Sequence, residues 1–258
     1  MNNNDEFQLY LKSKYGTSMN GEPSFINFDL NNRPIIVGNE NKIKLTVSDA
    51  TIKVTWYNVN SYNNFLNIDG YHFNIDPKNY NVYTLLTELQ SILSFLNIDV
   101  TYDSASSIYI FYCTTAITIF DYSTCGTLLG LDFSDGDLFG NYIISTKIID
   151  LTYTSNIYIT SPQLLNISRD TYHTNALNDV LAILQVTTNN LGLIYYKSTL
   201  STILYTTKIT NFDIILKDEN NKILQMNGGY CNMTFTIKVI PNEFIQNQKN
   251  LLTSLGIN

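Results

Sequence analysis

Residues 79–112 read NYNVYTLLTELQSILSFLNIDVTYDSASSIYIFY, and their hydrophobic period changes from that of a helix to that of a strand. Asn81 stands where a helix N-cap belongs. Seven apolar residues follow at i, i+3, i+4, i+7 spacing, which is typical of an amphipathic helix of about four turns. They are Val82, Leu85, Leu86, Leu89, Ile92, Leu93 and Leu96. Period-two alternation on both sides of 103–107 then predicts a β-hairpin, on which we expect the helix to pack.

Outside this stretch the chain has the pattern of strands and turns. Residues 42–59, KIKLTVSDATIKVTWYNV, alternate before and after SDA, which predicts two strand segments joined at a turn or a bulge. A short helix capped by Ser123 is expected at 124–130, with Gly130 in the left-handed conformation after it. The segment 132–141 is expected to be turns. Further strands are predicted at 34–37, 116–120, 148–153, 156–160, 180–186, 193–198, 208–218, 222–226 and 233–240.

The composition favours one β-sandwich. The chain has 258 residues, of which 44% are hydrophobic and only 14% charged, and it contains 19 Tyr and 13 Phe. β-Branched and aromatic residues are enriched in pleated, half-buried strands. The chain shows no internal repeat and no linker, so the strands before and after the helix are expected to belong to one sandwich.

The charge and the cysteines exclude several classes of protein. A net charge of −7 provides no basic face for direct nucleic-acid binding. No apolar run approaches the roughly 20 residues of a membrane span, and the N-terminus lacks the pattern of a cleaved signal. Cys113, Cys125 and Cys231 are an odd number without CxxC spacing, so we predict no disulfide framework, no zinc site and a reducing compartment.

The sequence contains no enzyme signature. The only histidines, His72 and His173, lie in polar segments that are typical of surface loops. Asp132, Asp135 and Asp137 lack the glutamate that closes an EF-hand loop, so a solvated turn is the favoured interpretation. No P-loop, GxGxxG, GxSxG or HExxH motif occurs. We therefore predict a protein that is not an enzyme, with no catalytic, cofactor-binding or metal-ligating residues.

Both ends of the chain have the pattern of arms that contact neighbouring subunits. Residues 1–25 are polar with one apolar group, and Pro241 begins a second segment, 241–258, with a short amphipathic pattern. The candidate inter-subunit contacts are Phe7, Leu9, Tyr10, Leu11, Phe244, Ile245, Leu251 and Leu252.

The order of the patterned segments resembles a known family. The segments that carry the resemblance are NRPIIV, KIKLTVSDATIKVTWYNVN, NYNVYTLLTELQSIL, IDVTYDSASSIYIFY and STCGTLLGLDF, followed by SNIYITSPQLLN, NDVLAILQV, GLIYYKS and ITNFDIILKDENNKILQMNGGYCNMTFTIKVI. Over roughly residues 25–240 they resemble minor capsid or penton proteins of virophages, polinton-like viruses and related large DNA viruses of eukaryotes. The likeness lies in strands and turns and involves no catalytic motif.

The resemblance implies a single jelly-roll, in which two four-stranded sheets pack face to face. The helix and hairpin, about 82–130, are then an insertion in it. The expected organisation is an arm at 1–25, a jelly-roll at 26–240 with its insertion at 60–130, and a tail at 241–258. The implied protein is a virion subunit, either a penton or another minor capsid protein. It would assemble in the host cell cytoplasm, with itself as a pentamer, with double jelly-roll major capsid proteins and with other minor capsid proteins.

Two other functions stay open at this stage. A β-sandwich that binds carbohydrate or a receptor, as in a spike or adhesin, would use exposed tyrosines and Trp56 to stack on sugars. An enzyme on a β-sandwich would need a cluster of polar groups with perturbed titration, and the sequence offers no such cluster.

Overall fold

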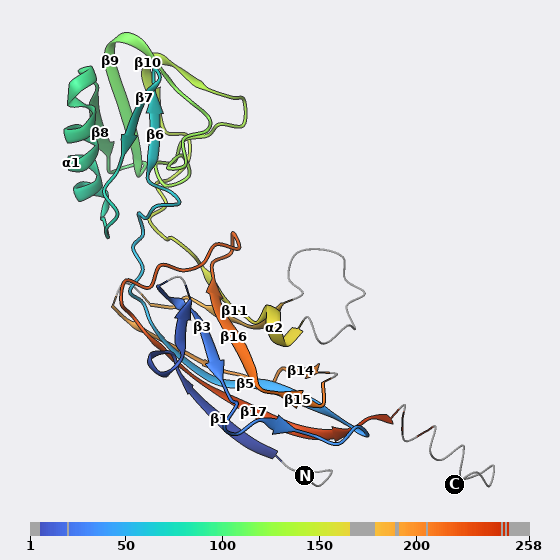
Figure 1. Ribbon diagram of the computed structural model, residues 1–258. Coiled ribbons are helices and arrows are strands. Elements are labelled where there is room, and N and C mark those ends of the chain that lie inside the picture. Colours follow the sequence, from blue (N-terminus) through green and yellow to red (C-terminus); the bar gives the residue numbers. More distant parts are fainter. Residues whose placement is uncertain are drawn as a thin grey trace, which may run out of the picture. The chain divides into compact units, whose positions relative to one another are not determined.

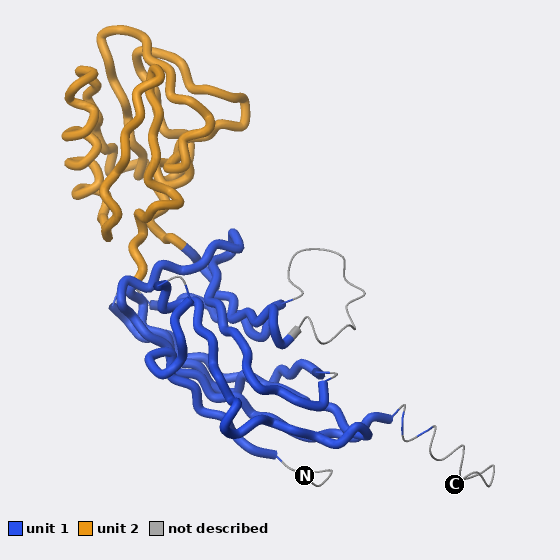
Figure 2. Tube along the Cα trace, viewed as in Figure 1, with its two compact units in different colours: residues 1–55, 154–258 blue, residues 56–153 orange. Residues whose placement is uncertain are grey.

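The computed structural model describes residues 6–19, 21–165, 179–188, 191–204, 206–243, 245 and 247. The chain divides into two compact units, coloured separately in Figure 2. Unit 1 consists of residues 1–55 and 154–258, and unit 2 consists of residues 56–153.

Unit 1 is a sandwich of two antiparallel sheets (Figure 1). Sheet A contains, in spatial order, β1 (Glu6–Lys12), β17 (Cys231–Pro241), β5 (Asn41–Lys53) and then β13 (Leu193–Lys197) with β14 (Ser201–Leu204). Sheet B contains β12 (Val180–Gln185), β11 (Asn156–Thr160), β16 (Asn211–Lys217), β3 (Glu22–Asp29) and β2 (Thr17–Met19). A small ribbon of β4 (Ile35–Ile36) and β15 (Lys208–Ile209), and the short helices η1 (Ser13–Tyr15) and α2 (Pro162–Leu165), complete the unit.

The strand pairing of unit 1 is that of a jelly-roll. The first strand pairs with the last, and each following strand pairs with the next one inward from the C-terminal end. The pairs are β1 with β17, β3 with β16, β5 with β13 and β14, and β11 with β12. This nested antiparallel pairing places alternate pairs in opposite sheets, which is the arrangement of a double-sheet jelly-roll. The structure therefore confirms the predicted mainly β, single jelly-roll fold. Unit 2 is inserted between β5 and β11, the third and fourth of these strands.

Strand β5 contains a bulge. Before it, odd-numbered residues face the core, and after it, even-numbered residues do. Ile43, Leu45 and Val47 are buried in its first half, and Ala50 and Ile52 in its second half. Along β17, Thr234 pairs with Asp49 and Phe235 pairs with Val47, so Ser48 is the extra residue. A bulge of one residue reverses the alternation, so the two predicted strand segments are one strand joined at a bulge. This strand ends at Lys53, and the predicted continuation to residue 59 is wrong.

Unit 2 is a sheet with a helix on one face (Figure 1). Its elements are β6 (Phe65–Ile68), β7 (Tyr71–Asn74), α1 (Val82–Leu93), η2 (Ser94–Leu96), β8 (Asp99–Asp103), β9 (Ile108–Ile119) and β10 (Leu138–Ile144). The order in the sheet is β10, β9, β6, β7, with β8 paired to β9. The long hairpin of β8 and β9 follows the helix, as predicted.

The helix begins and packs as its sequence predicts. The Asn81 side chain accepts hydrogen bonds from the backbone N–H groups of Tyr83 and Thr84, both at 3.0 Å, and the Asn81 N–H donates to the Thr84 hydroxyl. This is a reciprocal capping box. All seven residues of the predicted stripe belong to the core cluster of unit 2 or pack against it, and Leu85, Leu89 and Leu93 are fully buried.

Several local predictions are wrong. Residues 124–130 form successive turns and not a helix, although Gly130 does have a positive φ, 69°. Residues 138–141, predicted as turns, are part of β10, which pairs with β9 and has a register shift between Gly140 and Tyr142. Strands β2, β3 and β14 were not predicted.

Two predicted strands are absent from fully described segments, 148–153 and 222–226. In each, an aspartate turns the backbone. The Asp150 carboxylate accepts a hydrogen bond from the Thr152 N–H, and Asp218 accepts from the N–H groups of Asn220 and Lys222. Such local bonds compete with strand pairing. Only an isolated bridge between Lys217 and Ile223 remains in the second segment.

The organisation also differs from the expected one in its boundaries. The inserted unit spans 56–153, where 60–130 was expected, because β10 and Ile149 complete its core. Residues 6–12, expected in an arm, form β1 and pair along their whole length with β17.

Leu89→Ala should destabilise unit 2 by about 2–5 kcal/mol, because it leaves a cavity beneath a fully buried side chain. Ser91→Ala, an exposed change on the same helix, should alter stability by less than about 0.5 kcal/mol. Urea unfolding of both variants, followed by circular dichroism, measures the two effects. Equal midpoints for Leu89→Ala and the parent chain would show that the helix does not seal this core.

Candidate interaction surfaces

The predicted contact residues of β1 lie mostly inside unit 1. Leu11 is buried, and Phe7 and Leu9 are half-buried. Their partners in register on β17 are the buried residues Ile237, Phe235 and Met233. Tyr10 is 69% exposed and projects from the opposite side of the strand. Of these four, Tyr10 is the most exposed, and the other three also pack within unit 1. The predicted role of the four residues between subunits stays a prediction.

The other four candidates lie at the C-terminal end. Ile245 is half-buried. Phe244, Leu251 and Leu252 lie outside the residues whose side chains the structure describes. Their predicted role between subunits stays a prediction.

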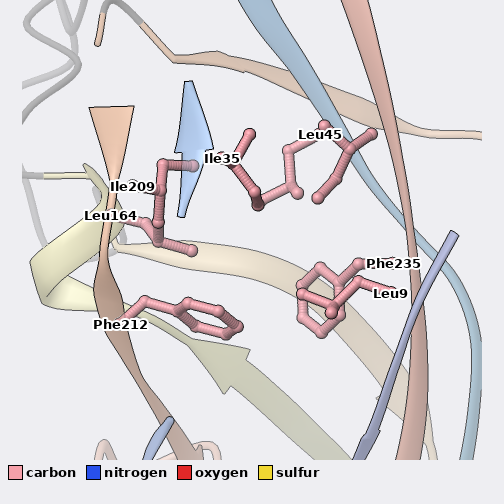
Figure 3. Close-up of a pocket in the computed structure, with 8 residues that line it drawn as sticks. Leu9, Ile35, Leu45, Leu164, Ile209, Phe212 and Phe235 are labelled. Carbon is pink, nitrogen blue, oxygen red and sulfur yellow. The ribbon is translucent and has the colours of Figure 1, made fainter. Parts of the chain in front are cut away.

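The space between the two sheets is too small for a ligand. An internal cavity of about 10 Å³ lies there (Figure 3), and this is the volume that a single water requires. Its lining is wholly apolar and comes from both sheets, with Leu9, Leu45 and Phe235 facing Phe212 and Leu164. An apolar gap of this size stays dry, so it is a packing feature and not a binding pocket.

The outer face of sheet A is basic. Six lysines alternate with buried residues along its strands, against only two acidic residues, Glu6 and Asp49. The lysines are Lys12, Lys42, Lys44, Lys53, Lys197 and Lys238. Lys44 on β5 and Lys238 on β17 are directly opposite each other in register. Like charges in this position repel each other and destabilise the strand pair. Exposed Tyr10, Leu193, Tyr195 and Ile203 lie on the same side. We call this surface the basic face, and the inference from net charge that the chain lacks a basic face is wrong.

Unit 2 has an apolar surface on the side of its sheet opposite α1. Along β6, β9 and β10, most side chains that alternate with the core residues are aromatic or aliphatic, and Thr118 and the buried Asn67 are polar. The apolar ones are Phe65, Ile110, Tyr112, Phe139, Tyr142 and Ile144, and Phe120 and Tyr122 in the segment after β9 extend the surface. Phe139 is 75% exposed and Tyr142 is 54% exposed. In register, Tyr142 lies beside Tyr112 and Ile144 beside Ile110. We call this surface the open face.

The rings at one end of the open face contact one another. The centroid of Tyr122 lies 5.3 Å from that of Phe120 and 6.3 Å from that of Phe65. His72 meets the Phe65 ring edge-on at 5.2 Å. These contacts fix the rings in a continuous row, so the surface is preformed.

The negative charge of the chain resides in unit 2. Its 98 residues, 56–153, carry two lysines and ten acidic residues, for a net charge of −8, whereas unit 1 carries 13 basic and 12 acidic residues. Both lysines of unit 2 form ion pairs within it, Lys78 with Glu88 at 3.0 Å and Lys147 with Asp132 at 3.1 Å. The Lys147 ammonium group holds the pKa of the Asp132 carboxyl below its usual value. The remaining carboxylates of unit 2 have no basic partner within it.

Residues considered for catalysis or metal binding are not brought together. Asp132 is paired with Lys147, and His72 contacts an aromatic ring. In the part of the chain that the structure describes, three or more metal-ligating side chains meet nowhere. His173 lies outside that part. No helix among the described residues is long and apolar enough to cross a bilayer.

The three cysteines are buried and unpaired. Burial raises the pKa of the Cys125 thiol from 9.0 to about 12 and that of the Cys231 thiol to about 11. A thiol must ionise and be accessible to react, so these two are structural. Trp56, weighed as a sugar-stacking residue, is only 5% exposed and is not available for stacking.

Unit 1 is thus a single jelly-roll, an architecture found in viral capsid proteins and in lectins. No protein-family model and no curated protein matches the chain in sequence. Among solved structures, the crystal structure of selenomethionine-labelled mavirus penton protein is similar, with a TM-score of 0.50 and 12% sequence identity. The match covers 92% of this chain and 100% of that chain, so it extends beyond unit 1 into unit 2.

The comparison establishes the fold and agrees with the resemblance seen in the sequence. Two proteins at 12% identity share a backbone arrangement, and function does not follow from this alone. The two surfaces described above were not found from sequence, because alternation marks two sides of a strand without showing which side is covered.

In the folded protein, Ellman's reagent at pH 8 should label no thiol over minutes, because all three cysteines are buried. After unfolding in guanidinium, three thiols per chain should react. The absorbance at 412 nm measures both values. Rapid labelling of one thiol in the native protein would show that its segment opens to solvent.

Proposed function

We propose that the chain is a structural subunit of a virus capsid, a penton or another minor capsid protein. It assembles with itself, as a pentamer, and with double jelly-roll major capsid proteins and other minor capsid proteins. Its place is the virion, after assembly in the host cell cytoplasm. The observation that carries this proposal is the fold similarity to the mavirus penton protein, which extends over 92% of the chain.

The surfaces of the described residues are consistent with a protein that works by association. They bear large exposed apolar side chains, including Tyr10, Phe139 and Tyr195, and the cavity between the two sheets of unit 1 is too small for a substrate. Contiguous exposed apolar side chains mark protein–protein contacts more often than catalytic sites. A non-enzymatic role is part of the proposal.

The purified chain should form an oligomer of about five times its 29.4 kDa mass, because rotational symmetry closes identical contacts into a ring. Sedimentation equilibrium measures the mass, and co-sedimentation with a double jelly-roll major capsid protein measures partner binding. A monomer at all concentrations that fails to bind that protein would overturn the proposal.

Deletion of residues 244–258 should reduce this assembly and leave thermal unfolding cooperative, if the tail contacts neighbouring subunits. The predicted contacts of β1 require a point change, because its other apolar residues lie inside unit 1. Tyr10→Ser should weaken assembly, and Tyr15→Ser, a similarly exposed control, should not. Loss of cooperative unfolding on removal of the tail would make it part of the core.

The alternative function is binding of carbohydrate or a receptor. The open face favours it, since the exposed Tyr112 and Tyr142 lie side by side on neighbouring strands. Aromatic rings of this kind stack on sugars. A glycan array probed with the full chain tests the alternative. Binding that Tyr142→Ser abolishes supports it, and an array without hits removes it for carbohydrate.

A further inference from the structure

The open face of unit 2 combines an apolar centre with an acidic rim. Asp99 stands in register beside Tyr112. At the other end of the sheet, the Asp69 carboxylate accepts a hydrogen bond from the Thr118 N–H at 2.7 Å, and Asp137 accepts one from the Asp121 N–H at 2.8 Å. These bonds hold the acidic turns against the ends of β9 and β10.

No basic side chain of unit 2 is available to neutralise this rim. The structure describes every residue of unit 2, and the two lysines of the unit are held by Glu88 and Asp132. An interface normally has an apolar centre and a polar rim, and its charges are complementary to those of the partner. The open face therefore fits a surface with exposed apolar groups among lysines or arginines.

Two open faces do not fit each other. A contact between the same face of two copies would bring two units of net charge −8 together. It would also place the acidic rims side by side. Repulsion of this kind disfavours a symmetric pair.

The chain itself bears a surface of the required kind. The strands of the basic face carry six lysines and two acidic residues, for a net charge of +4, and Glu243 lines a hollow beside Lys44 and Ile203. Lys12, Lys44, Lys53, Lys197 and Lys238 form no ion pair with any residue that the structure describes. Tyr195, which is 74% exposed, and Tyr10 supply apolar area. Lys44 and Lys238 are side by side on β5 and β17, and Glu6 is the acidic residue in register with Lys238 on the β1 side.

We propose that the acidic, aromatic open face of unit 2 docks on the basic face of sheet A of a second copy of the chain. The inference rests on the proposed self-assembly and names the surfaces that produce it. Because the two surfaces differ, the contact is heterologous. Contacts of this type generate rings when the rotation between copies closes.

Sedimentation velocity of the full chain across a range of concentrations tests the contact. Lys44→Glu with Lys238→Glu should raise the dissociation constant at least about tenfold, because both changes reverse charge at the centre of the basic face. Tyr112→Ser with Tyr142→Ser should have a similar effect through lost apolar contact. Raising the salt from about 0.05 to 0.5 M should weaken the parent oligomer, because salt screens complementary charges.

Matched controls separate the contact from general effects. Lys14→Glu with Lys208→Glu reverses two exposed lysines that lie elsewhere in unit 1, and Tyr83→Ser removes an exposed tyrosine from α1. Both should assemble as the parent does. Thermal melting of every variant establishes that it is folded.

A charge exchange provides the decisive measurement. Asp99→Lys with Asp121→Lys, added to the lysine reversals, should restore the dissociation constant to within about threefold of the parent value. Oligomers that form normally in folded variants of both faces would overturn the docking and leave the proposed capsid function standing. A parent chain that stays monomeric at every concentration would overturn the docking, and one that also fails to bind a double jelly-roll major capsid protein would overturn the proposed function as well.

Discussion

Strand β5 must keep its apolar side chains between the two sheets over its whole length, and the rest of unit 1 depends on this constraint. β5 pairs with β17 on one side and with β13 and β14 on the other. The bulge at Ser48 lets both halves of the strand bury their apolar residues. In a regular strand, Ala50 and Ile52 would face outward and Thr51 would face the core. Sheet A would then lose its inner face along half of its central strand.

The jelly-roll tolerates a large insertion because its strand pairs are nested. The connection from β5 to β11 leads from one sheet to the other. The length of this connection does not affect the pairing of either strand. Unit 2 has its own core, built on α1, β8 and β9, so it folds around contacts that the sandwich does not supply. This separation permits the two units to differ in surface chemistry.

The two units differ in net charge and in the chemistry of their exposed surfaces. A sandwich that is nearly neutral carries one basic face, and the inserted unit concentrates the negative charge around exposed aromatic side chains. The proposed structural role starts from fold similarity to a penton protein, and the proposed contact between the two surfaces would provide a physical route to self-assembly. Neither surface requires bound metal, perturbed histidine or a reactive thiol.

The sequence by itself determined the elements whose signals are local. The stripe from Val82 to Leu96 and the cap at Asn81 predicted α1, and alternation predicted the long strands and the change of parity near Ser48. Local signals suffice for these because the helix period, the cap and the pleat act over a few residues.

Only the tertiary structure decided which faces are covered. β1 has the composition of an arm, yet Leu9 and Leu11 complete the sandwich because β17 offers an edge for pairing. Residues 138–144 contain turn-forming Gly140 and Asn141, yet they form β10 because β9 provides a partner. Helix α1 covers one side of the sheet of unit 2, and the open face on the other side is left exposed. The alternation of a strand defines two faces, and long-range packing selects which of them is buried.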